Sequence, residues 1–222
     1  MAVRKKLQRR EVKHDTFVEF VYRASDYLLR HVQQVFIIVG VVVVAGGAGY
    51  LYSRMRQSRD EEAARLLAPA QIAAQRGQYK EAIPAYERVL REHDGTRSAG
   101  EAAIALGNAY FHVGRTDDAL KTFQRYLNDH QDEDELLTIS AMAGMAACGE
   151  QQGKYLDAAK RYQQTAEQFA TSFIAPRLLI DAGRCYDAAG QKAQAKQMYD
   201  KVVTAYKTSR YVREAKVALA AL

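Results

Sequence analysis

One short pattern returns four times along this 222-residue chain and limits its folding more than any other feature. Each copy starts with a glycine, has an alanine five positions later and an aromatic residue four positions after that. The copies begin at residues 77, 114, 153 and 190, and they contain Gly77, Ala82, Tyr86, Gly114, Ala119, Phe123, Gly153, Ala158, Tyr162, Gly190, Ala195 and Tyr199. Self-similarity at such a period is typical of stacked units that bury their apolar faces against each other.

The pattern has a helical interpretation. A glycine can end a helix in the left-handed conformation and allow a tight turn into the next helix. An alanine and an aromatic residue four positions apart lie on one helix face. We expect the alanine to let two helices approach closely and the aromatic ring to fill the space between neighbouring pairs. With only three prolines and many Ala, Leu, Gln and Arg residues, the sequence predicts an all-α fold.

The copies resemble the tetratricopeptide repeat family, whose helices read W-x2-L-G-x2-Y and A-x3-F. The second copy fits best, with Ala103, Leu106, Gly107, Tyr110, Ala119 and Phe123. The fourth copy follows, with Leu179, Ala182, Gly183, Tyr186, Ala195 and Tyr199. The third is looser, with Met142, Met145, Ala146 and Gly149, and the first is weakest because we expect Pro69 to kink its first helix.

The resemblance implies an α-solenoid of about four helix pairs within residues 63–222. We expect the end of the chain, from Arg210 to Leu222, to form a capping helix over the last open face. The copies are longer than 34 residues, and in this they are similar to the periplasmic subfamily found in bacterial envelope-assembly proteins.

Residues 32–52 form an uncharged apolar run of 21 residues. As a helix the run would extend roughly 30 Å, the thickness of the hydrocarbon core of a bilayer, so we predict a transmembrane helix. A buried core helix would carry a polar stripe, which this run lacks from Val35 to Tyr52. A cleaved signal peptide is disfavoured because more than 30 residues precede the run, among them a capping pattern at Thr16 and Glu19.

The segments beside the run set its expected orientation. Residues 1–31 contain eight Lys and Arg against four Asp and Glu, so we predict a basic cytoplasmic tail with an interfacial helix that includes Tyr22 and Tyr27. Residues 53–62 are predicted to be a juxtamembrane connector. Within the run, Ala45 and Gly49 have the spacing that lets transmembrane helices pack closely, and they are candidate contacts for another helix.

The rest of the composition argues against several functions. From Ser53 onward 24 basic residues face 22 acidic ones, which predicts a mixed surface and no nucleic-acid partner, although the net charge is +6. No motif for phosphate binding, nucleophilic catalysis or zinc coordination occurs, so we predict no enzyme, cofactor, metal or small-molecule substrate. The acidic run 132–135 is expected to stabilise the start of a helix. Cys148 and Cys185 are expected to be buried thiols, too far apart for a disulfide.

Stacked helix pairs leave a concave face that is lined by their first helices. By phase, we predict that this protein-binding face includes Ile104, Asn108, Phe111, His112, Arg177, Arg184 and Asp187. Tetratricopeptide clamps for acidic chaperone tails need a spaced set of Lys, Asn and Arg, of which only Asn108 is suitably placed. The sequence therefore disfavours a carboxylate-clamp function.

One predicted span followed by repeats is similar in layout to the ancillary subunit of the bacterial Sec translocon. This resemblance implies a scaffold at the bacterial inner membrane with a cytoplasmic N-terminus and periplasmic repeats. Such a scaffold would contact lipid through residues 32–52 and bind other proteins for translocation, periplasmic chaperone recruitment or envelope assembly. The alternative is a non-catalytic accessory subunit of a large respiratory, photosynthetic or secretion complex.

Overall fold

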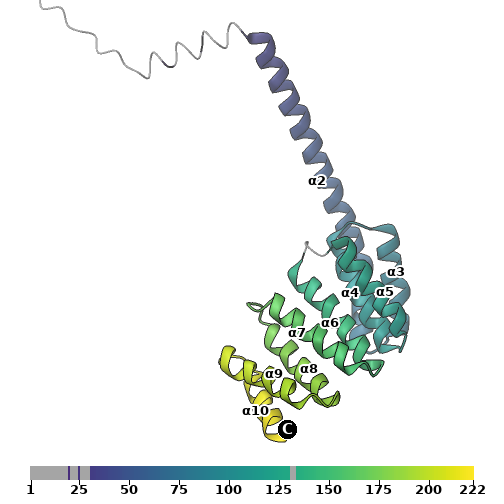
Figure 1. Cartoon of the computed structure of the whole chain (residues 1–222). Coiled ribbons are helices and arrows are strands. Elements are labelled where there is room, and N and C mark those ends of the chain that lie inside the picture. The colour runs from purple at the N-terminus through teal and green to yellow at the C-terminus, as the bar shows by residue number, and fades with distance from the viewer. Residues whose placement is uncertain (1–19, 21–24, 26–30, 131–133) are drawn as a thin grey trace, which may run out of the picture. The chain divides into compact units, whose positions relative to one another are not determined.

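A computed structural model describes Phe20, Ser25 and residues 31–130 and 134–222 of the chain (Figure 1). Its contacts divide the chain into two units, residues 1–55 and 56–222. The basic tail with Thr16, Glu19, Tyr22 and Tyr27, and the acidic residues Asp132 and Glu133, lie outside the described residues. Predictions for these residues therefore remain predictions.

The described part is helical and contains no strand, so the all-α prediction is confirmed. Its helices are α2 (Val32–Gln75), α3 (Tyr79–Glu92), α4 (Arg97–His112), α5 (Thr116–His130), α6 (Glu135–Gln151), α7 (Tyr155–Gln168), α8 (Ala175–Ala188), α9 (Lys192–Ala205) and α10 (Val212–Ala221). From α3 to α10 each helix packs against the next in sequence, and α4 also packs against α6. This is a solenoid of four helix pairs with α10 as the capping helix.

The first unit contains the apolar part of α2. Its most apolar 18-residue window has a mean hydropathy of 2.2, and none of that window is buried. Phe36, Val44 and Tyr52 are 72%, 72% and 70% exposed. Helix α2 is long and apolar enough to cross a membrane, judged by length and composition. It is assigned as one helix through the predicted connector 53–62 and through Pro69.

The four repeat glycines end the first helix of each pair as predicted. Gly77, Gly114, Gly153 and Gly190 have φ between +75° and +79°, a conformation that side chains with a Cβ rarely adopt. Beyond each first helix the same two hydrogen bonds form. In the second pair, Gly114 N donates to Phe111 O at 3.1 Å and Arg115 N to Tyr110 O at 2.9 Å. These bonds satisfy carbonyls that the helix end would otherwise leave free.

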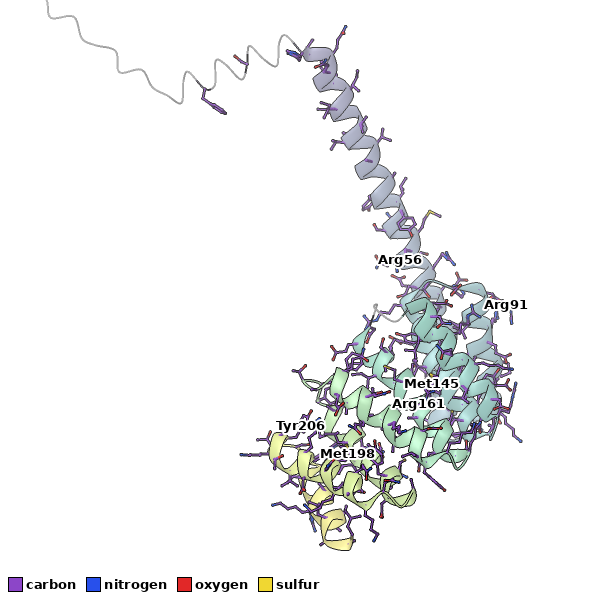
Figure 2. All side chains as sticks on the ribbon, in the orientation of Figure 1. Arg56, Arg91, Met145, Arg161, Met198 and Tyr206 are labelled. Atoms are coloured by element: carbon purple, nitrogen blue, oxygen red, sulfur yellow. The ribbon has the colours of Figure 1, made fainter. Side chains whose placement is uncertain are left out.

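The alanine and aromatic positions form the core of the second unit. All four repeat alanines are fully buried, and Tyr86, Phe123, Tyr162 and Tyr199 are at most 5% exposed. The ring of Phe123 lies between two glycines, because a Cβ placed on Gly107 or Gly144 would come within 2.4 or 2.5 Å of it. Figure 2 shows the side chains of the described residues, among them Met198, which is also buried in the core.

Polar side chains fix the starts of two first helices. Thr96 Oγ1 accepts a hydrogen bond from Ala99 N at the start of α4, and Asp60 of α2 accepts one from Ser98 N at 2.8 Å. Asp134 Oδ1 accepts from Leu136 N at 2.9 Å and from Leu137 N at 3.2 Å at the start of α6. The prediction that the acidic run stabilises a helix start is confirmed for Asp134.

Candidate protein-binding surface

Most residues predicted for the binding face keep accessible surface. Asn108, His112, Arg177, Arg184 and Asp187 are exposed. Phe111 is half-buried. They come from α4 and α8, the first helices of the second and fourth pairs.

Ile104 departs from the prediction. It is 7% exposed and belongs to the core cluster that surrounds Phe123. Helix α4 packs against α3, α5 and α6, and Ile104 lies in the core cluster to which residues of these helices contribute. Ile104 therefore offers almost no surface to a partner.

Three rings form an aromatic patch that consists of Tyr79, Phe111 and His112. The His112 ring stacks on Tyr79 with 4.2 Å between centroids and 12° between planes, and Phe111 meets His112 edge-on at 5.7 Å. Tyr79 is the first residue of α3 and was not predicted, although it follows the turn glycine Gly77 by two positions. Because the rings hold each other in place, the patch presents apolar surface at low cost in side-chain entropy.

Charged residues of α6 and α8 form an ion network that consists of Glu150, Arg177, Asp181 and Arg184. Arg184 donates to both carboxylate oxygens of Glu150, and its Nη2 also lies 3.3 Å from Asp181 Oδ1. Arg177 Nε donates to Asp181 Oδ2 at 3.1 Å. The hydrogen bonds from Arg184 hold the pKa of Glu150 below its ordinary value. The predicted residues Arg177 and Arg184 are thus already paired within the chain.

Glu150 and Asp181 are site residues that the sequence did not identify. Glu150 lies 34 residues before Arg184, close to one repeat length, so the two residues occupy facing positions on neighbouring first helices. The charge on Glu150 and its spacing from Arg184 are the sequence signals that could have identified this pair. A partner carboxylate near Arg184 would have to compete with these internal acids.

The two cysteines are free and buried, as predicted. Burial raises the pKa of the Cys148 thiol to about 11 and that of Cys185 to about 12. Thiols with such values are poor nucleophiles at neutral pH. Within the described ranges, no group of three His, Cys, Asp or Glu residues could hold a metal ion.

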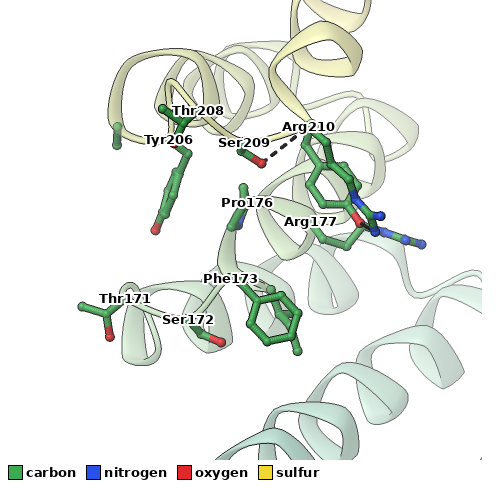
Figure 3. A pocket seen from close by; sticks show the side chains of 12 residues that line it. Thr171, Ser172, Phe173, Pro176, Arg177, Tyr206, Thr208, Ser209 and Arg210 are labelled. Carbon is green, nitrogen blue, oxygen red and sulfur yellow. Dashed lines mark hydrogen bonds between the residues drawn. The ribbon is translucent and has the colours of Figure 1, made fainter.

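A cavity of about 800 Å³ lies between two loops of the second unit. One loop precedes α8 and the other precedes α10. The lining consists of Thr171, Ser172, Phe173, Ile174, Pro176, Arg177, Ala205, Tyr206, Thr208, Ser209, Arg210 and Tyr211. Figure 3 shows Phe173, Arg177 and Arg210 around it. We call this cavity the loop cleft. It was not predicted, because loop residues follow no helical period.

Known proteins support the fold. A family model described as tetratricopeptide repeat matches residues 73–143 and 150–219. A tetratricopeptide repeat protein from Parabacteroides merdae has a similar structure, with a TM-score of 0.57 and 16% identity over 72% of this chain. This chain covers 59% of that protein.

Putative kinesin light chain repeats from Podospora anserina, described as nearly identical and tetratricopeptide-like, are also similar. The TM-score is 0.55 with 19% identity, and the match covers 74% of this chain and 83% of that one. No curated protein matches the chain. The family model covers more than half of the sequence, and its two matches include all four copies of the repeated pattern. The chain belongs to the tetratricopeptide repeat family.

Proposed function

We propose that this chain is a membrane-anchored adaptor that binds other proteins at the bacterial inner membrane. In this proposal residues 32–52 cross the bilayer, the N-terminus is cytoplasmic and the repeats are periplasmic. The repeats recruit chaperones or client proteins to a translocation or envelope-assembly machine. Tetratricopeptide repeats are interaction scaffolds, which supports the general class.

The exposed apolar surface of α2 is the observation that supports a membrane anchor. Its large side chains are exposed to solvent within the chain, including Ile37 at 65% and Val43 at 66%. Leaving each of them in water costs about 1.5 to 3 kcal/mol relative to burial, so lipid or protein must cover them. A continuous apolar run of this length matches a bilayer.

Fractionation tests the anchor. The full chain should stay with membranes after alkaline carbonate washing, and a variant with Val39→Arg and Val43→Arg should be released. A matched variant with Ala64→Arg and Ala68→Arg, at exposed positions of α2 beyond the run, should remain with membranes. Recovery of the unchanged chain in the soluble fraction would contradict the anchor.

Sidedness can be read with introduced cysteines, because the native thiols are buried. Ser58→Cys should react with a membrane-impermeant maleimide in intact spheroplasts if the repeats are periplasmic. A cysteine placed at Ala2 should react only after lysis. The reverse pattern would place the repeats in the cytoplasm.

Site-specific photocrosslinking tests protein binding. A photoreactive residue at Asn108 or Asp187 should capture discrete proteins in cells, whereas one at Lys160, exposed on the second helix α7, should capture fewer. Equal capture from all three positions, or none, would defeat the proposed binding face.

Purification in mild detergent separates the adaptor from an accessory subunit of a large complex. Salt-sensitive capture of varied proteins below stoichiometry is expected for the adaptor. Fixed stoichiometry with one complex would favour the accessory subunit, in which Ala45 and Gly49 would contact a neighbouring helix. The Cβ position of Gly49 has no atom within 4 Å, so close approach of another helix is sterically open there.

A further inference from the structure

The loop cleft brings two guanidinium groups to one tyrosine ring. The guanidinium carbons of Arg210 and Arg177 lie 4.9 and 6.0 Å from the centroid of Tyr211. Arg210 Nη2 donates to the Tyr211 hydroxyl at 2.7 Å. Hydrogen bonds from Arg210, and then from Arg177, lower the pKa of Tyr211. The ring therefore fixes both cations at the edge of the cleft.

Positive charge in this region is not balanced by the residues that line it. Arg177 is paired with Asp181, but Arg184 shares that same carboxylate. A second cavity of about 590 Å³ shares Ser209 and Arg210 with the cleft and adds Arg213 and Lys216. The linings of the two cavities contain four Lys and Arg residues and no Asp or Glu. Such a surface attracts anions.

Apolar surface lies beside these charges. Phe173 is 75% exposed on the loop before α8, and Val217 is 65% exposed on α10. Tyr206 forms part of the wall, and its hydroxyl is fixed by a 2.8 Å hydrogen bond to Ala170 O. The cleft therefore combines cations with the exposed ring of Phe173, and Val217 lines the second cavity beside it.

One buried hydroxyl in the cleft has no partner. Ser172 is 8% exposed and lines the cavity, and its Oγ makes no hydrogen bond with any described residue. A buried polar group without a partner costs about 1 to 3 kcal/mol.

We propose that the loop cleft binds an acidic segment of a partner protein that carries carboxylates beside a large apolar side chain. The carboxylates pair with Arg177 and Arg210, and the apolar side chain packs on Phe173. A volume of about 800 Å³ suits a few side chains. This inference rests on the proposed adaptor function and deepens it by giving the chemistry of the partner. The cleft lies at the loops, away from the aromatic patch on α3 and α4.

Binding of defined peptides tests the inference. The full chain in mild detergent is titrated into a fluorescein-labelled peptide that contains four glutamates around one phenylalanine. We expect saturable binding that weakens as salt increases. A peptide with glutamine in place of glutamate, and one with alanine in place of phenylalanine, should each bind at least about fivefold more weakly.

Variants locate the binding. Arg210→Gln and Phe173→Ala should each weaken binding at least about fivefold, because each removes one side of the recognition. Arg88→Gln, which removes another exposed arginine, paired with Glu92 on α3, should leave binding unchanged. Phe173 and Arg210 are both exposed, so these variants should keep the circular dichroism spectrum and melting temperature of the parent chain.

Three outcomes would overturn the inference. The first is absence of peptide binding, and the second is an equal loss in the Arg88 and Arg210 variants. The third is Arg210-dependent binding to phosphatidylglycerol vesicles without peptide binding, which would make the cleft a lipid contact. If crosslinking from Asn108 or Asp187 still captures proteins in that case, the adaptor function survives and only the chemistry of the partner is wrong.

Discussion

At the residue scale, glycines on the first helices make room for aromatic rings of the second helices. Phe123 fits between Gly107 and Gly144, and Tyr199 fits against Gly183 in the same way. The sequence identified Gly107 and Gly183 through the family pattern. It did not identify Gly144, because that residue lies in the third copy, whose first helix matches the pattern loosely.

Replacing Gly107 by alanine should destabilise the chain. The new Cβ would lie 2.4 Å from a ring carbon of Phe123, and Gly144 blocks the other side of the ring. We expect the free energy of unfolding to fall by about 1 to 3 kcal/mol, measured by urea titration with circular dichroism. Gly149→Ala is the control, because its Cβ would meet only the Ala158 Cβ at 3.7 Å. Equal stability of the two variants would contradict this packing.

The native thiols should not react with maleimide in the folded chain. Because burial raises the pKa of Cys148 to about 11 and of Cys185 to about 12, almost no thiolate exists at pH 7.5. Intact-mass spectrometry should show no adduct on the folded chain and two adducts after unfolding in guanidinium chloride. Rapid labelling of the folded chain would show that these helices open.

At the scale of single helices, local sequence signals predicted the helices and the turns between them. They did not predict the contacts between helices of different repeat copies. Each turn depends on one glycine with positive φ, which the repeated pattern reveals. The pairing of Glu150 with Arg184 depends on how α6 and α8 align, which no local pattern specifies. Ile104 is likewise buried in a core cluster that joins residues of several helices, which no local pattern specifies. Phe173 and Tyr211 escaped prediction because they lie outside the periodic segments.

The ion network between α6 and α8 should make stability depend on pH. The pKa of Glu150 is lowered in the folded chain, so its contribution is fully present above the ordinary pKa near 4.5 and is lost as pH falls through the folded value. Both side chains are partly exposed, so the effect should stay below about 1 kcal/mol.

Glu150→Gln should remove that part of the pH dependence. Thermal unfolding of the parent chain and the variant between pH 3 and pH 7 measures the difference. The melting temperatures should differ at pH 7 and converge toward pH 3. A constant difference across this range would show that the network does not titrate with folding.

At the scale of the whole chain, the repeats form two core clusters. Phe123 and Tyr126 belong to the first, and Tyr162 and Tyr199 belong to the second. Helix α10 closes the second cluster with the fully buried Ala215, and Leu219 and Leu222 are partly buried beside it.

Removal of residues 212–222 should expose the outer side of α9. We expect the free energy of unfolding to fall by about 3 kcal/mol. Ala215 would no longer be buried, and Leu219 and Leu222 would lose their partial burial. Sedimentation velocity should also show association that increases with concentration. Val217→Ala, at an exposed position of α10, is the control and should unfold like the parent chain. Unchanged stability after the deletion would mean that α10 does not act as a cap.

The packing of the Phe123 ring between two glycines has a consequence for exchanging repeats of this protein. Gly107 and Gly144 belong to two successive copies, and both must be glycine for one ring to fit. A graft that cuts between α4 and α5, or between α5 and α6, would place a foreign helix against one side of that ring. The piece that keeps both contacts is therefore longer than the helix pair that the pattern suggests, and it runs from the first helix of one pair through its second helix to the first helix of the next pair.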